Sequence, residues 1–143
     1  MVRFQEAQTV AVASILLAGA FGEARSQTDN RQRPSTPTDI AKAIADGIEA
    51  NTLRSSPGAL LEFESATSRG NIVVMKFIVN DFAAFDGFKS NSDKTRVALV
   101  TYWCSESRVA SLRQGVVIHT TYARSDNNDR VEFTIDKSSC TTQ

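Results

Sequence analysis

The spacing of apolar residues predicts a helix at the start of the folded part of the chain. Ile40, Ile44 and Ile48 recur every four residues, which places one apolar stripe along a helix that ends near residue 51. Thr38 or Asp39 can cap its first turn, because an oxygen of either side chain accepts a hydrogen bond from an unpaired backbone N–H there.

Four later segments are predicted to be strands. Two of them, residues 61–65 and 131–135, alternate between apolar and polar positions, which is the period of a half-buried strand. Val73, Met75 and Phe77 share one face of the most hydrophobic segment, and Lys76 falls on the other. Residues rich in glycine, asparagine and aspartate join the segments in pairs and favour hairpin turns. The expected strands are residues 61–65, 72–79, 116–122 and 131–135, with turns at 69–71 and 125–129.

Between the two pairs of strands the pattern turns helical. A phenylalanine stands at every third position from 82 to 88, which suits a short helix or a packed loop. Ser92 can cap a longer helix over residues 93–104, and a further helical piece over 107–114 stops at Gly115. This order predicts an α+β fold, with an antiparallel sheet of about four strands packed on two to three helices.

The amino-terminal part of the chain has the features of a secretory signal peptide. Arg3 precedes an uncharged apolar run at residues 10–21, and small residues follow it. A run of about 12 apolar residues is too short to cross a bilayer. The alternative is a buried core helix. We expect a signal peptide at residues 1–24, a flexible leader at 25–37 and a single α+β domain at 38–143.

Cys104 and Cys140 are the only two cysteines. In an exported chain, two cysteines most simply form one disulfide. A reactive thiol pair or half of a metal site are the alternatives, but neither cysteine lies in a C-x-x-C motif, and a zinc site would be short of ligands. We therefore predict a structural disulfide between Cys104 and Cys140 and a periplasmic or secreted location.

The charge balance of the chain excludes a general attraction to nucleic acid or to anionic membranes. It has 16 basic and 16 acidic residues among 143. Binding of that kind needs a basic excess or a basic stripe. No glycine-rich phosphate loop is present, and no cofactor is expected.

Few polar residues could carry chemistry. Glu62 and Glu64 share a predicted strand face about 7 Å apart, near the range used in glycoside cleavage, although a solvated strand face explains them as well. The only histidine, His119, would have to serve any Ser-His-Asp or Cys-His set, and a sheet histidine is the alternative. Residues 126–129 could ligate calcium but lack an EF-hand's glycine and distal glutamate, which favours a hairpin turn.

Five aromatic residues cluster in the middle of the chain. They could simply form core, or they could line an apolar surface groove for a helix of another protein, between the helix at 93–104 and the sheet. The candidate groove residues are Phe82, Phe85, Phe88, Tyr102 and Trp103.

The carboxy-terminal half resembles a pattern seen in small exported bacterial α+β proteins. Its parts are a helix-borne Cys104, a following Arg108, Gly115 opening a strand, and a closing Cys140 after the last strand. The pattern is similar to that of the pilotins of type II secretion and covers about residues 60–140. The resemblance implies a sheet-and-helix domain with one disulfide that binds a helix from a secretin. Pilotins are typically lipoproteins, whereas this chain has no lipid-acceptor cysteine, so no stable membrane anchor is expected.

These observations favour a non-enzymatic exported protein that acts by binding another protein, with a secretion-system accessory as one form of that function. An immunity or inhibitor protein against a toxin or a wall-degrading enzyme is the alternative within the binding class. A small secreted hydrolase that uses Glu62, Glu64 or His119 is the alternative from a different class.

Overall fold

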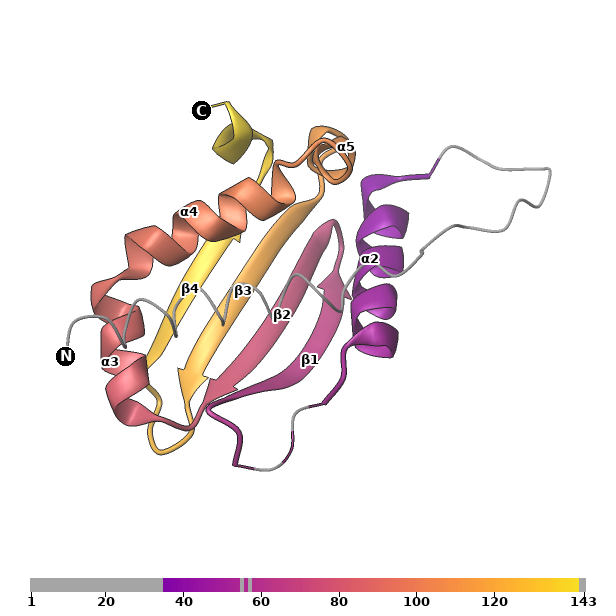
Figure 1. Cartoon of the computed structure of the whole chain (residues 1–143). Helices are drawn as coiled ribbons and strands as arrows, with labels where there is room; N and C mark the ends of the chain where they lie inside the picture. The colour runs from indigo at the N-terminus through magenta and orange to yellow at the C-terminus, as the bar shows by residue number, and fades with distance from the viewer. Residues whose placement is uncertain (1–34, 55, 57, 142–143) are drawn as a thin grey trace.

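The structure, a computed structural model, describes residues 35–54, 56 and 58–141 (Figure 1). The predicted signal peptide and nearly all of the predicted leader lie outside the described residues. The order of elements confirms the α+β class. The elements are α2 (Pro37–Asn51), β1 (Leu61–Arg69), β2 (Ile72–Val79), α3 (Phe82–Ser90), α4 (Ser92–Trp103), α5 (Val109–Arg113), β3 (Val117–Arg124), β4 (Arg130–Ile135) and the 3₁₀ helix η1 (Lys137–Cys140).

The four strands form one sheet in the order β1-β2-β3-β4. The outer pairs, β1 with β2 and β3 with β4, are antiparallel as predicted. The central pair, β2 with β3, is parallel, so the sheet is mixed rather than wholly antiparallel. The reason lies in the connection: α3, α4 and α5 carry the chain back to the start of β2, so β3 enters alongside it in the same direction.

The first strand is longer than expected and contains a bulge. The register of β1 against β2 shifts between Phe63 and Ser65, which leaves Glu64 as the extra residue. Because of the shift, Ala66 rather than Ser65 lies in the core after Phe63. The alternation predicted for residues 61–65 therefore ends at the bulge.

Helix α2 begins earlier than predicted. Thr36 is its N-cap and accepts a hydrogen bond from the backbone N–H of Asp39, while the Asp39 carboxylate accepts one from the N–H of Thr36. Pro37, which has no N–H to satisfy, occupies the first helical position. Asp39 is thus the second half of a capping box rather than the cap itself.

The two helices after β2 also differ from the predicted starts. Residues 82–90 form a helix, α3, whose N-cap Asp81 accepts a hydrogen bond from the N–H of Ala84. Ser92 was expected to cap α4, but the N-cap is Asn91, and its side chain makes no capping hydrogen bond. The close succession of α3 and α4 leaves no room for a separate capping turn at Ser92.

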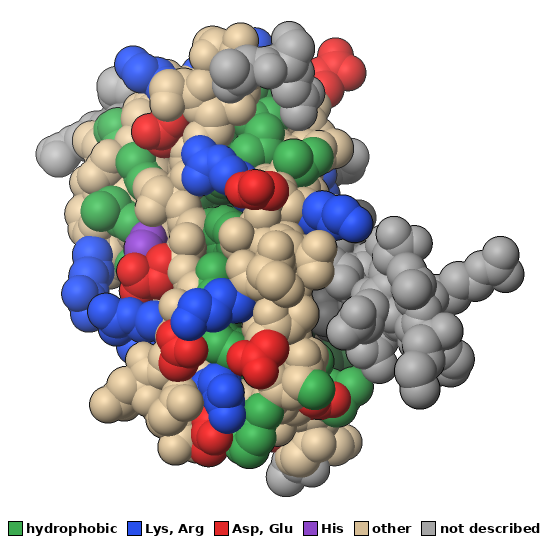
Figure 2. Space-filling view, turned by 90° about the vertical axis from the view of Figure 1, so that its left-hand side faces the viewer, with side chains coloured by type: hydrophobic (Ala, Val, Ile, Leu, Met, Phe, Trp, Pro, Cys, Tyr) green, Lys and Arg blue, Asp and Glu red, His purple; other side chains and the backbone are tan. Residues whose placement is uncertain are grey.

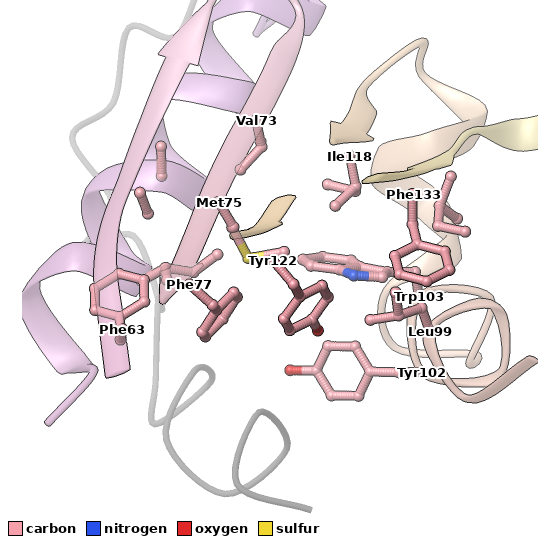
Figure 3. Packing of buried hydrophobic residues seen from close by; sticks show 14 of the residues in the cluster. Phe63, Val73, Met75, Phe77, Leu99, Tyr102, Trp103, Ile118, Tyr122 and Phe133 are labelled. Atoms are coloured by element: carbon pink, nitrogen blue, oxygen red, sulfur yellow. The ribbon is translucent and has the colours of Figure 1, made fainter. Parts of the chain in front are cut away.

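One row of aromatic side chains crosses the sheet beneath the helices (Figure 3). Phe77 stacks on Tyr122 with ring centroids 5.1 Å apart, and the centroids of Phe88 and Tyr122 are 4.5 Å apart. Phe63 and Phe133 extend the row toward β1 and β4. Every buried residue of the four strands lies on this face, so the opposite face of the sheet, which we call the outer face, remains partly or fully exposed.

The free edge of β1 is covered by polar side chains. The carboxylate of Glu49 accepts a hydrogen bond from the backbone N–H of Ala66, and Arg54 donates one to the backbone oxygen of Glu64. Glu49 and Arg54 also form an ion pair with each other. This pair satisfies backbone groups that an edge strand otherwise offers to a neighbouring chain.

Candidate functional site

The predicted disulfide is present. Cys104 and Cys140 are bonded, with Cα atoms 5.3 Å apart, and the bond joins the end of α4 to η1. The arginine of the sequence pattern, Arg108, lies close by. Its guanidinium stacks 3.9 Å from the centroid of the Tyr102 ring and donates a hydrogen bond to Ser105 Oγ. The segment that carried the resemblance therefore forms one packed corner of the domain.

Four of the five aromatic residues predicted to line a groove belong to the core. Phe85 is fully buried, and Phe88, Tyr102 and Trp103 are at most 8% exposed. These four rings therefore form core, which was the alternative interpretation, rather than an exposed surface. The helical spacing that suggested a surface stripe turns them toward the sheet instead. Phe82 is 42% exposed and is the one member that reaches the surface.

The candidate catalytic residues do not come together. Glu62 accepts hydrogen bonds from the N–H of Gly58 and the side chain of Asn80, whereas Glu64 is the exposed residue of the bulge. His119 Nδ1 forms a hydrogen bond with Thr134 Oγ1. Through the strand register, Glu62 and His119 lie two strands and four residues apart, roughly 16 Å, which is far beyond the reach of proton transfer.

The turn at residues 125–129 is a hairpin turn, and its acidic side chains point to cations rather than to a shared metal position. Asp126 receives both hydrogen bonds of a bidentate pair from Arg124, each 2.7 Å long. Asp129 accepts hydrogen bonds of 2.9 and 3.1 Å from Lys89. Among the described residues, no group of three or more histidine, cysteine or acidic side chains could hold a metal ion.

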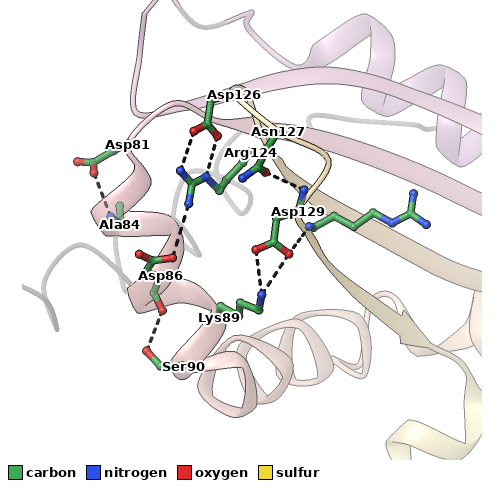
Figure 4. Close-up of polar contacts among 10 residues, drawn as sticks. Asp81, Ala84, Asp86, Lys89, Ser90, Arg124, Asp126, Asn127 and Asp129 are labelled. Carbon is green, nitrogen blue, oxygen red and sulfur yellow. Dashed lines mark hydrogen bonds and ion pairs between the residues drawn. The ribbon is translucent and has the colours of Figure 1, made fainter.

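These ion pairs join α3 to the β3–β4 hairpin and form a site that the sequence analysis missed (Figure 4). Arg124 reaches from the end of β3 to α3, where its Nη1 lies 3.8 Å from Asp86. We call the surface formed by Phe82, Asp86, Lys89, Arg124, Asp126 and Asp129 the α3–hairpin patch.

The exposed aromatic ring of the patch is held in place by the same arginine. The guanidinium carbon of Arg124 lies 4.4 Å from the centroid of the Phe82 ring, a cation–π distance. The Arg124 side chain is only 17% exposed, because Phe82 and Asp126 cover it. The guanidinium thus contacts the exposed ring and Asp126 at the same time.

The electrostatics of the patch follow from these bonds. Hydrogen bonds from Arg124 lower the pKa of the Asp126 carboxyl, and hydrogen bonds from Lys89 lower the pKa of Asp129. The hydrogen bonds to Asp126 raise the pKa of Arg124 in turn. Asp126, Asp129 and Arg124 therefore stay charged at neutral pH. The patch holds three acidic and two basic side chains. The patch has an apolar ring inside a slightly acidic rim.

A view from the side of α3 and α4 shows acidic and basic side chains interspersed over the lower half of the molecule, where α3 lies in Figure 1 (Figure 2). An exposed aromatic ring with an arginine beside it is typical of binding surfaces between proteins. The sequence held a partial signal: Asp81 is a good helix cap before Phe82, and Arg124 ends an alternating strand two residues before Asp126. None of the described helices is long and apolar enough to cross a membrane.

Solved structures of other proteins share this fold. A protein from Pseudomonas aeruginosa that is predicted to be secreted aligns with a TM-score of 0.63 at 17% identity, covering 77% of this chain and 99% of that one. The pilotin EpsS of the Vibrio vulnificus type 2 secretion system aligns with a TM-score of 0.58 at 19% identity, and the alignment covers 75% of this chain and 94% of that one. The Vibrio cholerae type II secretion system pilotin AspS aligns with a TM-score of 0.52 at 15% identity, and the alignment covers 73% of this chain and 92% of that one. No family model and no curated protein matches the chain. The resemblance to pilotins inferred from the sequence is confirmed at the level of the fold.

Proposed function

We propose that this protein works outside the cytoplasm and acts by binding another protein through the α3–hairpin patch. The observation that carries the proposal is the exposed ring of Phe82, held on a rigid base by Arg124. A fixed aromatic anchor binds with less loss of conformational freedom than a mobile one. The disulfide supports an oxidising compartment, since such bonds persist there and are rare in the cytosol.

A binding function accounts for the chain better than an enzymatic one. The two glutamates and the histidine that could do acid–base chemistry are spread over the outer face of the sheet, as described above. Two of the similar structures are pilotins of type II secretion, which supports a secretion-system accessory as the finer form of the proposal.

The chemistry of the patch defines the partner. An apolar side chain of the partner would pack against its ring, and its excess of one carboxylate over the two cations favours a basic residue beside that side chain. An amphipathic helix with an apolar residue next to lysine or arginine meets both requirements, because residues three or four positions apart share a helix face.

Photocrosslinking in the organism that makes the protein tests this proposal. A photoreactive amino acid at position 82 is expected to capture a specific partner. The same amino acid at position 97 is the control, because Val97 is 63% exposed on α4 and lies outside the patch. Equal capture at both positions, or capture at 97 alone, would overturn the proposed site.

The identity of the captured protein separates the alternatives. A secretin supports the secretion-system accessory, whereas a toxin or a wall-degrading enzyme supports an inhibitor. Phe82→Ala is expected to abolish capture from a neighbouring patch position such as 86 without unfolding the protein.

A further inference from the structure

The outer face of the sheet carries several apolar residues, although every described helix packs on the other side. On the two central strands these residues are Ile72, Val74, Ile78, Val117 and Ala123, all partly exposed, with the polar Lys76, His119 and Thr121 among them. Strand β2 is apolar on both faces except at Lys76. Parallel strand pairs normally have both faces covered, and continuous apolar runs are typical of strands buried on two sides. The outer side of β2 therefore resembles a strand surface that is normally covered.

Charged side chains flank two of these apolar residues. The strand register places Glu62, Ile78, Ala123 and Arg130 in one row across the sheet. An acid thus stands at the β1 edge of the row and a base at the β4 edge, with two apolar residues between them. The next row has Lys76 on β2, Thr121 on β3 and Glu132 on β4, and Glu132 forms an ion pair with Arg130. The order of the first row is complementary to its own image.

We infer that a second copy of this chain binds the outer face, with a two-fold axis parallel to the strands and lying between β2 and β3. Rotation about that axis places β1 of one copy over β4 of the other. Glu62 of each copy then faces Arg130 of the other, which gives two ion pairs. Ile72 faces Val117, and Ile78 faces Ala123, so the apolar residues at both ends of the two central strands cover each other, while Val74 faces His119 and Lys76 faces Thr121 between them.

The size of the face sets the strength of this association. Four strands at about 4.8 Å spacing and eight residues at about 3.3 Å per residue give about 500 Å² per copy. The total of about 1,000 Å² is at the lower limit for a specific interface. The dimer is expected to be weak and to form in the micromolar range or above. The α3–hairpin patch, which lies on α3 and the turn after β3, stays available in the dimer.

Sedimentation equilibrium of the purified protein, from low micromolar to near-millimolar concentration, tests the inference. Reversible dimerisation is expected. Arg130→Glu is expected to weaken it at least about tenfold, since two like-charge contacts replace two ion pairs. Glu62→Lys alone should weaken it similarly, and the double variant Glu62→Lys with Arg130→Glu should restore the dissociation constant to within about threefold.

Arg96→Glu is the matched control, because Arg96 is exposed on α4, on the helix side of the sheet. It is expected to leave the association unchanged. Glu62 also accepts hydrogen bonds from Gly58 and Asn80, so Arg130→Glu keeps the test decisive if Glu62→Lys proves poorly folded by circular dichroism. A protein that stays monomeric at every concentration, or a dimer indifferent to Arg130→Glu, would overturn the inference. Neither result bears on the α3–hairpin patch.

Discussion

The guanidinium of Arg124 stacks 4.4 Å from the centre of the Phe82 ring, although the two residues belong to different secondary-structure elements. The same guanidinium holds Asp126 with two hydrogen bonds. One side chain therefore fixes both the exposed ring of α3 and the β3–β4 turn.

Arg124→Lys tests this double role while keeping the positive charge. Lysine has no planar fork to hold Asp126 with two bonds and stacks less well on a ring. We expect a melting temperature lower by a few degrees and faster amide hydrogen exchange in residues 125–129. Arg113→Lys, at an exposed position of α5, is the control and should change neither. Unchanged exchange in the turn would show that Arg124 does not fix it.

Acidification should loosen the α3–hairpin contact. The pKa values of Asp126 and Asp129 are lowered in the folded protein by hydrogen bonds from Arg124 and Lys89. Their stabilising contribution is therefore complete above the unfolded value of about 3.9 and is lost as the pH falls through the lower folded values. Thermal melts between pH 2 and 6 should show this loss, and Asp126→Asn should make the profile flatter. Identical profiles for both proteins would contradict the prediction.

Loss of the disulfide should lower stability strongly. The bond closes a loop between Cys104 and Cys140, which on the chain-entropy model contributes about 4 kcal/mol. At about 4–8 °C per kcal/mol, the melting temperature should fall by well over 10 °C. The double variant Cys104→Ser with Cys140→Ser should match the reduced wild-type protein in a calorimetric scan. Equal melting temperatures for the reduced and the oxidised protein would refute a stabilising role of the disulfide.

Residues on the buried face and on the outer face of the sheet should respond differently to truncation. Phe77→Ala and Phe133→Ala should each cost about 3–5 kcal/mol, since both rings are 5% exposed and would leave cavities. Lys76→Ala, on the outer face next to Phe77, should be nearly silent in the free energy of unfolding measured with urea. A cost at Lys76 equal to that at Phe77 would mean that the two faces of β2 are exchanged.

The sequence predicted what depends on local periodicity. In residues 72–79 the single charged residue, Lys76, identified the outer face of β2 correctly, because each strand residue points opposite to its neighbour. The bulge at Glu64 broke the same rule in β1, since an extra residue is accommodated only through pairing with β2. The parallel central pair was missed for a similar reason: nothing in either strand records the direction of its neighbour.

The candidate site depended even more on distant contacts. A phenylalanine at every third position gave the helix but not the side that the sheet covers, so Phe82 and Phe85 looked equivalent in sequence and differ completely in exposure. The contact of Phe82 with Arg124 joins α3 to the end of β3, and no spacing in the chain encodes it.

The parallel pairing of β2 with β3 also governs how the chain folds. The β1–β2 and β3–β4 hairpins close through short turns, but they can meet only after the whole α3–α4–α5 connection has been brought back over the sheet. Contacts between strands so distant in sequence slow folding, because the entropy of closing the connection is lost before the contacts form. The disulfide lies entirely within the later half of the chain and does not span this step. We therefore expect the docking of two preformed hairpins to limit the folding rate, with or without prior oxidation of the cysteines.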